Sequence, residues 1–186
     1  MTAMDRLIYT IGHSTRTIEE FVDILRGVDV RCVVDVRTIP RSRTNPGYNL
    51  DILPETLAGW QIRHRYISEL GGRRGRQKNV PPELNGFWDN QSFHNYADYA
   101  LSGDFRAGLD ELAGMARETP CAIMCSEAVW WRCHRRIIAD YLLADGWTVF
   151  HLMSRGRTES ARLTPAASLS LGSILYPRGL IGAQGH

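Results

Sequence analysis

The chain contains almost no lysine, because Lys78 is the only one among its 22 basic residues. Its positive charge is carried by arginine, whose planar guanidinium can bind a carboxylate or phosphate through two parallel hydrogen bonds. A bias of arginine over lysine also follows from genome composition, so both interpretations stay open. The formal net charge is only +2, which argues against a strong general attraction to nucleic acids or membranes.

The chain also lacks long apolar runs. No stretch approaches the length of a membrane-spanning helix, and residues 1–9 do not form a charged-then-apolar leader. We therefore expect a cytoplasmic protein with no membrane partner. In that compartment the cysteines should be reduced thiols rather than a disulfide framework. They are Cys32, Cys121, Cys125 and Cys133.

Three motifs with well-defined chemistry are missing. Gly12 stands without a GxGxxG series, so we do not expect dinucleotide chemistry. His13, Cys125, Cys133 and His134 are ligand types for zinc or iron, but they follow neither a CxxC nor an HExxH spacing. The spacing therefore does not favour a native metal or a CxxC-type redox pair, and a metal stays open as an alternative. The sequence identifies no cofactor and no oligomeric state.

Apolar runs alternate with helical patterns along most of the chain, which predicts an α/β fold. A capping box from Thr17 to Glu20 should open the first helix, and Gly27 should end it. Asp104 is expected to cap a later helix, and Gly146 to end the last. The predicted strands are 7–11, 31–36, 62–67, 121–125 and 147–152. The predicted helices are 17–27, 54–58, 93–101, 104–116 and 131–144.

The length of 186 residues and the 44% hydrophobic content suit one core. We expect residues 1–153 to form a single three-layer α/β domain. Its mostly parallel sheet of about five strands should be flanked by helices, in a Rossmann-like topology without the dinucleotide fingerprint. Residues 154–186 carry no periodic pattern and are interpreted as a C-terminal tail of uncertain order.

Polar side chains follow three of the predicted strands. Since the carboxyl ends of parallel strands lie at one edge of a sheet, these side chains should converge on a pocket. They are His13 and Ser14 after the first strand, Asp35 and Arg37 at the second, and Cys125 and Glu127 at the fourth.

An ordered set of short motifs extends from residue 8 to residue 152. It comprises Ile11-Gly12-His13-Ser14, Val34-Asp35-Val36-Arg37 with Pro40, Ser42-Arg43 and Pro46, then Leu70-Gly71-Gly72, and finally Cys125, Glu127 and Cys133-His134-Arg135. In this set the chain resembles DUF488, a family of domains of unknown function. The family usually has Ala between the Cys and the Glu, and Asp-Pro soon after. This chain has Ser126 and Ala128-Val129-Trp130 there, and the resemblance implies no established reaction.

Glu127 is predicted to be the principal proton-transfer group, assisted by Cys125 or His13. A carboxylate just beyond a buried strand either pairs with a cation or keeps a raised pKa suited to acid–base work. Arg37, Arg135 and His13 are the candidate cations. A salt bridge that only braces two loops is the alternative.

The remaining candidates are predicted to bind the substrate. Cys133 and His134 should lie in the first turn of a helix, where the dipole stabilises a thiolate, although a buried and inert thiol has the same pattern. At least one arginine of the proline-stiffened loop should bind an anion, unless that loop is merely solvated. The full set is Ser14, Asp35, Arg37, Arg41, Arg43, Cys133, His134 and Arg135.

Three classes of function remain open. The first is an enzyme that acts on a small anionic ligand, such as a nucleotide or a nucleic-acid-like substrate, with Glu127 as general acid or base. The second is a phosphate-binding or nucleic-acid-binding module that stacks bases on Trp88, Trp130 or Trp131. The third is a Cys/His metal-binding or thiol-based protein. An enzyme requires Glu127 in a cleft beside His13 or a thiol.

Overall fold

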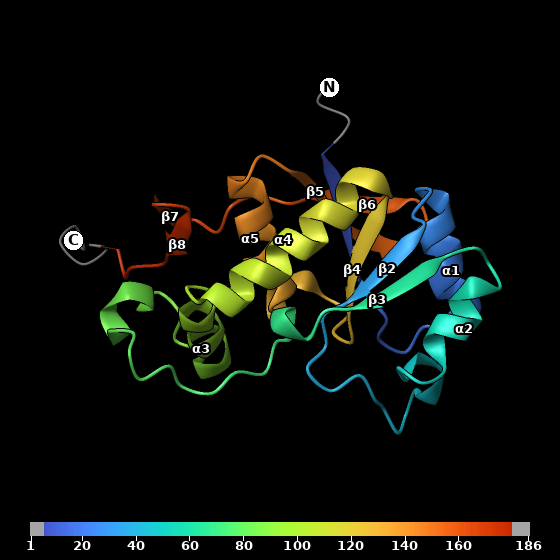
Figure 1. Ribbon diagram of the computed structural model, residues 1–186, viewed down its shortest axis with the longest axis horizontal. Helices are drawn as coiled ribbons and strands as arrows, with labels where there is room; N and C mark the ends of the chain where they lie inside the picture. The colour runs from blue at the N-terminus through green and yellow to red at the C-terminus, as the bar shows by residue number, and fades with distance from the viewer. Residues whose placement is uncertain (1–5, 180–186) are drawn as a thin grey trace, which may run out of the picture.

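The computed structural model describes residues 6–179, in which a six-stranded mixed sheet lies between two layers of helices (Figure 1). The strand order is β3-β2-β4-β1-β5-β6; the first five strands are parallel, and β6 is antiparallel to β5. The predicted three-layer α/β fold is confirmed, with one strand more than expected. The strands are β1 (Leu7–Gly12), β2 (Cys32–Asp35), β3 (Arg63–Tyr66), β4 (Cys121–Cys125), β5 (Thr148–Ser154) and β6 (Arg157–Ser160).

Each face of the sheet has its own hydrophobic core. Val33 packs with α1 and α2, whereas its neighbour Val34 packs with α3, α4 and α5, because successive side chains of a strand point to opposite faces. Within residues 6–179, no helix has the length and apolar character needed to cross a membrane. The helices are α1 (Ile18–Gly27), α2 (Leu53–Ala58), α3 (Gln91–Tyr99), α4 (Gly103–Glu118) and α5 (Arg135–Ala144). Short 3-10 turns are η2 (Pro46–Tyr48), η3 (Ser68–Leu70), η4 (Pro82–Asn85) and η5 (Trp130–Arg132).

The neighbouring strands β1 and β4 are followed by connections that lead to opposite sides of the sheet. After β1 the chain passes through α1 to β2 on one side, and after β4 it passes through α5 to β5 on the other. Two adjacent parallel strands whose connections diverge in this way leave a crevice at their carboxyl ends. The fold therefore places the segments after β1 and β4 at the usual position of a ligand site.

Several helix ends differ from the sequence prediction. The Thr17–Glu20 capping box is present, but the left-handed residue after α1 is Asp29, with φ 57°, and not Gly27. The N-cap of α4 is Ser102, whose hydroxyl accepts from the Phe105 amide at 3.3 Å; Asp104 lies inside the first turn. The left-handed turn at Gly146, with φ 91°, is confirmed.

The largest shift concerns α5, which begins at Arg135 rather than near residue 131. Residues 130–132 form the separate turn η5, His134 is the N-cap, and Cys133 precedes the helix. Cys133 is extended, with ψ 147°, which ends η5 and delays the helix. The prediction that Cys133 and His134 lie in the first helical turn is therefore wrong.

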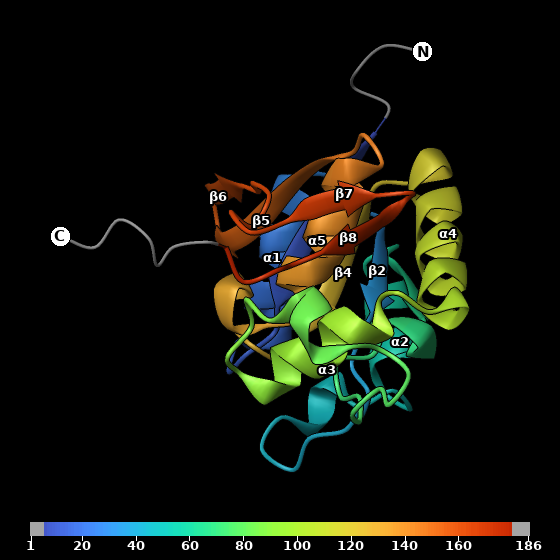
Figure 2. The ribbon, with the colours of Figure 1, turned by 90° about the vertical axis from the view of Figure 1, so that its left-hand side faces the viewer.

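The described part of the C-terminal tail is packed on the domain. Besides β6, it contains a hairpin of β7 (Ser168–Ser170) and β8 (Ser173–Leu175), which lies across α5 (Figure 2). Tyr176 is fully buried and its hydroxyl donates to the Asp140 carboxylate at 2.8 Å. These strands were not predicted, because they are only three or four residues long and rich in serine.

Candidate functional site

A cavity of about 370 Å³ opens at the carboxyl ends of the parallel strands. Four residues that the sequence predicted to converge line it together: His13, Arg37, Cys125 and Glu127. Three further predicted residues also line it, namely Arg41, Cys133 and His134. The other four predicted residues, Ser14, Asp35, Arg43 and Arg135, lie outside the cavity lining.

Close backbone contact joins the segments that follow β1 and β4. The His13 amide donates to the Cys125 carbonyl at 2.9 Å, and the Ser14 amide donates to the Ser126 carbonyl at 3.0 Å. A Cβ on Gly12 would overlap the Glu127 carbonyl oxygen, so only glycine fits there. Ser14 thus contributes its backbone to this junction and not a side chain to the cavity.

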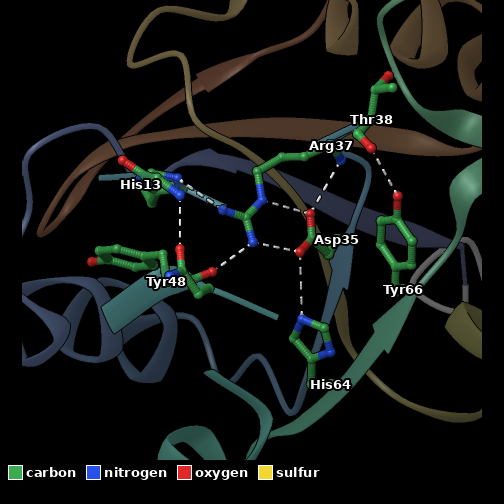
Figure 3. Close-up of polar contacts among 9 residues, drawn as sticks. His13, Asp35, Arg37, Thr38, Tyr48, His64 and Tyr66 are labelled. Carbon is green, nitrogen blue, oxygen red and sulfur yellow. Dashed lines mark hydrogen bonds and ion pairs between the residues drawn. The ribbon is translucent and has the colours of Figure 1, made fainter. Parts of the chain in front are cut away.

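Arg37 is held in a buried polar network, which we call the closed cluster and which consists of His13, Asp35, Arg37 and His64 (Figure 3). Its Nε and Nη2 donate to the two Asp35 carboxylate oxygens at 2.9 and 2.7 Å. Burial alone would raise the pKa of Asp35, but the hydrogen bonds from Arg37 hold that pKa below its usual value. His64 Nε2 lies 3.7 Å from the same carboxylate, beyond hydrogen-bond distance. The Arg37 charge is paired with Asp35 within the protein, which argues against a role in anion binding although Arg37 lines the cavity.

His13 is part of the same network, although its ring lines the cavity. Its Nδ1 lies 2.9 Å from the Ser14 carbonyl, to which only a protonated nitrogen can donate. The other nitrogen, Nε2, then accepts from Arg37 Nη1 at 3.4 Å. Burial lowers the pKa of His13 to about 4. Both nitrogens are engaged in a neutral ring, which makes His13 a poor assistant for proton transfer.

Arg135 is the second buried guanidinium of the region, with an exposed fraction of 1%. Its Nε donates to Cys133 Sγ at 3.2 Å, and its Nη2 donates to the Glu127 carbonyl oxygen at 2.6 Å. Its Nη1 donates to Thr10 Oγ1 at 3.3 Å. Among residues 6–179 no carboxylate pairs with this charge. A buried cation requires a compensating anion, and the sulfur of Cys133 is the acceptor that can carry one.

The two thiols of the cavity have opposite tendencies. Burial would raise the pKa of Cys133, but hydrogen bonds from Cys125 and Arg135 lower it to about 6. The hydrogen bond to Cys133 and burial together raise the pKa of Cys125 to about 12. Of the two thiols, Cys133 is therefore the one whose ionisation is favoured. Cys133 also belongs to the hydrophobic core, so the contacts of Arg135 with its sulfur add to a packing role and do not replace it.

His134 presents one nitrogen to the Cys133 sulfur. Its Nε2 lies 2.8 Å from the Val36 carbonyl oxygen and must donate to it, so Nδ1 carries the lone pair. Nδ1 lies 3.6 Å from Cys133 Sγ. Gly72 packs on the ring so closely that a Cβ there would overlap Nδ1. The donor atoms of Cys125, Cys133 and His134 lie within 4.8 Å of one another, and we call these residues the thiol cluster.

Glu127 lines the cavity, but it is not the enclosed carboxylate that the sequence analysis expected. Its side chain is exposed, and its carboxylate accepts only from the Val129 amide, at 3.4 Å. None of the predicted cations Arg37, Arg135 and His13 forms an ion pair with it within the described chain. Arg135 instead binds its backbone carbonyl. Glu127 is an exposed member of a cavity lining that it shares with His13 and the Cys125 thiol.

Three exposed arginines surround the cavity, and we call them the arginine rim: Arg41, Arg73 and Arg132. None of them forms an ion pair within residues 6–179. Arg43 is exposed on the same loop as Arg41 but does not line the cavity. Arg132 was missed in the sequence, although its place directly before Cys133 was a usable signal.

The residues able to hold a metal are the three members of the thiol cluster. Sequence spacing did not reveal them as a set, because η5 separates the two cysteines in sequence while folding brings them together. His13, the fourth ligand type considered, is not part of the group, since its ring is bound within the closed cluster.

The comparisons with known proteins identify a family without a described activity. A model of the family described as domain of unknown function DUF488 matches residues 17–142. This range includes the thiol cluster, the arginine rim and Arg135. No curated protein and no solved structure shows a significant match.

Proposed function

The chain belongs to the DUF488 family, and we propose that it is an enzyme that transforms a small anionic substrate at the thiol cluster. One observation carries this proposal: a single cavity has buried thiols and an imidazole in its inner wall and three unpaired arginines around its mouth. In this proposal the buried thiols and the imidazole are the reactive groups, and the exposed arginines bind the substrate.

The arginine rim is suited to hold the substrate. A guanidinium without a protein partner can form charge-assisted hydrogen bonds to a carboxylate or phosphate. Three such groups around one cavity favour an anion over a neutral ligand. The two buried guanidinium groups, Arg37 and Arg135, do not compete for it, because each is engaged within the protein.

The thiol cluster is the reactive centre in this proposal. Arg135 favours the anionic form of Cys133, which is both the stronger nucleophile and the better metal ligand. The His134 Nδ1 lone pair and the Cys125 thiol lie beside it. Glu127 is left as an exposed group at the mouth, so the leading role passes from this carboxylate to the cluster.

The shape of the site supports a small molecule rather than a polynucleotide. A volume of about 370 Å³ lies in the range of small-molecule pockets. Trp88 is buried and stacks on Phe93, so it offers no free face to a base, and one face of Trp130 is occupied by His151. Of the three candidate tryptophans only Trp131 is exposed.

The proposal is tested by ligand binding. Thermal unfolding is measured with inorganic phosphate, pyrophosphate, nucleoside monophosphates and small carboxylates, because a ligand that binds only the folded state raises Tm. Calorimetry on the best ligand should show that Arg41→Ala, Arg73→Ala and Arg132→Ala each weaken binding about tenfold.

Two arginines outside the cavity lining provide matched controls. Arg43→Ala changes the loop that carries Arg41, and Arg76→Ala changes the loop that carries Arg73. Both variants should bind like the unaltered protein. If no anion raises Tm, or if the control variants lose as much affinity as the rim variants, the proposal is wrong.

A further inference from the structure

The thiol cluster has the geometry of a metal site. Tetrahedral zinc has metal–sulfur bonds of about 2.3 Å and metal–nitrogen bonds of about 2.0–2.1 Å, which place sulfur and nitrogen ligands about 3.6 Å apart. The distance from Cys133 Sγ to His134 Nδ1 is 3.6 Å. Cys125 lies within 4.8 Å of both. One ion can therefore contact all three donor atoms without a rearrangement of the backbone.

The His134 ring is oriented as a metal-binding histidine would be. Its Nε2–H donates to the Val36 carbonyl, which fixes the tautomer with the lone pair on Nδ1. Tyr96 packs edge-on against the ring, with centroids 5.0 Å apart, and Gly72 covers Nδ1 at close range. The nitrogen that faces the two sulfurs is thus the one that can bind a cation.

The sulfur of Cys133 also has the surroundings of a bound thiolate. The backbone N–H and the Nε–H of Arg135 both donate to it, at 3.5 and 3.2 Å. Such donors orient a ligating sulfur and stabilise its charge. With two thiolates a zinc ion forms a neutral unit, and the Arg135 charge then leaves the centre positive. A positive centre favours an anion as the next ligand.

The cluster offers three ligands and one open side. Among the described residues no other histidine, cysteine or carboxylate belongs to the group. All three members line the same cavity, so the remaining coordination position faces the substrate space. Three protein ligands with an open fourth position are typical of catalytic zinc, whereas structural zinc has four.

We propose that Cys125, Cys133 and His134 bind one zinc ion whose fourth position opens into the arginine-lined cavity. The mixed sulfur and nitrogen donors suit zinc better than magnesium or calcium, which prefer oxygen. The fourth position binds water, or an oxygen of the anion that the arginine rim holds. This inference deepens the proposed function and rests on it for the identity of that anion.

The experiment uses the full chain, stripped with a chelator and titrated with Zn²⁺ against a chromophoric competitor. We expect one zinc per chain. Cys125→Ser, Cys133→Ser and His134→Gln should each weaken binding by roughly 100-fold or more, since each removes one of three ligands. Cys32→Ser and Cys121→Ser are the matched controls, because these thiols are buried between β2 and β4, away from the cluster.

Cobalt in place of zinc gives a readout that does not require activity or a variant. The Co²⁺ form of the unaltered protein should show intense visible bands of a tetrahedral site and sulfur-to-cobalt charge transfer. Addition of thiocyanate should change the visible bands, because it enters the open position. The inference is overturned if the unaltered protein binds no metal, or if Cys32→Ser and Cys121→Ser abolish binding while Cys125→Ser and Cys133→Ser do not.

The two proposals fail separately. If the metal-free protein binds an anion through the arginine rim and takes up no zinc, the metal inference is wrong and the anion site stands. If zinc binds at the cluster but no anion raises Tm in either form, the metal site stands and the proposed substrate class is wrong.

Discussion

Two guanidinium groups are buried at the same edge of the sheet, and they are compensated in different ways. Arg37 faces Asp35 through two short hydrogen bonds inside the closed cluster, so its charge is matched by a carboxylate. Arg135 has no carboxylate among the described residues and directs its Nε to Cys133. The Arg37 charge is therefore compensated by a carboxylate without any ligand, whereas the acceptor available to the Arg135 charge is the Cys133 sulfur.

This difference separates stabilising polar groups from groups available for chemistry. The Arg37–Asp35 pair, with the contact from Arg37 to His13, joins the segments that follow β1 and β2. A buried cation beside a thiol changes the ionisation of that thiol instead. The four predictions below test whether the two guanidinium groups differ in this way.

The largest effect is expected from Asp35→Asn. This change keeps the size of the side chain but leaves the Arg37 charge buried without an anion, which should lower the free energy of unfolding by about 3–5 kcal/mol. Urea unfolding measures it. Asp110→Asn, an exposed change on α4, is the control and should stay within about 0.5 kcal/mol. A loss below about 1 kcal/mol at Asp35 would mean that the closed cluster is not a tight pair.

A smaller effect is expected from Cys133→Ala in metal-free protein. Loss of the acceptor for Arg135 should cost about 1.5–3 kcal/mol. The cost should shrink when Arg135→Met is made as well, giving a coupling energy of at least about 1 kcal/mol. Cys121→Ala combined with Arg135→Met is the control cycle and should be additive. Additivity in both cycles would show that Cys133 carries no charge for Arg135.

The Arg135 charge should also be visible in the pH dependence of stability. Burial, and then Arg135, lower the pKa of His151 to about 3. An unfolded histidine titrates near 6.5, so below that pH the unfolded chain binds more protons and stability falls as the pH falls. His151→Gln should make this fall shallower by up to about 1.4 kcal/mol per pH unit between pH 6.5 and pH 4. If the stability of the unaltered protein and of His151→Gln changed equally with pH, the lowered pKa of His151 would be refuted.

The smallest effect is expected from Glu127→Gln. The side chain is exposed and contacts only its own backbone turn, so the free energy of unfolding should change by less than about 0.5 kcal/mol. Cysteine alkylation rates should also stay the same within a factor of about two, since the Arg135 contact is made by the Glu127 carbonyl and not by the carboxylate. A large loss of stability or of alkylation rate would show that the Glu127 carboxylate acts on the thiol cluster after all.

The sequence was sufficient for the fold class and for the convergence of four predicted residues on one cavity. Strand and helix periods predicted the parallel sheet, and the polar residues after β1, β2 and β4 predicted which residues would converge. The roles of those residues were harder to predict, because they depend on contacts between segments. Nothing in the spacing of Asp35 and Arg37 shows that they pair with each other. Likewise, nothing in Cys133-His134-Arg135 shows that the guanidinium turns back onto the sulfur.

The leading chemical role was predicted for Glu127 and not for Cys133, because the local backbone before α5 could not be predicted from the sequence. A helix expected from residue 131 places Cys133 on a packing face, but η5 shifts the start to Arg135 and turns Cys133 toward the cavity. Cys133 has an extended backbone and lies before α5, so the helical period that places it on a packing face does not apply to it.

The most direct test of the central claim is the alkylation of metal-free protein with neutral iodoacetamide and anionic iodoacetate, with each modified cysteine identified by mass spectrometry. If Cys133 is a thiolate compensated by Arg135 beneath the arginine rim, it reacts first of the four cysteines. It should also prefer iodoacetate, relative to iodoacetamide, more strongly than glutathione does. Earlier reaction of Cys125, Cys32 or Cys121, or a reagent preference equal to that of glutathione, would contradict the account.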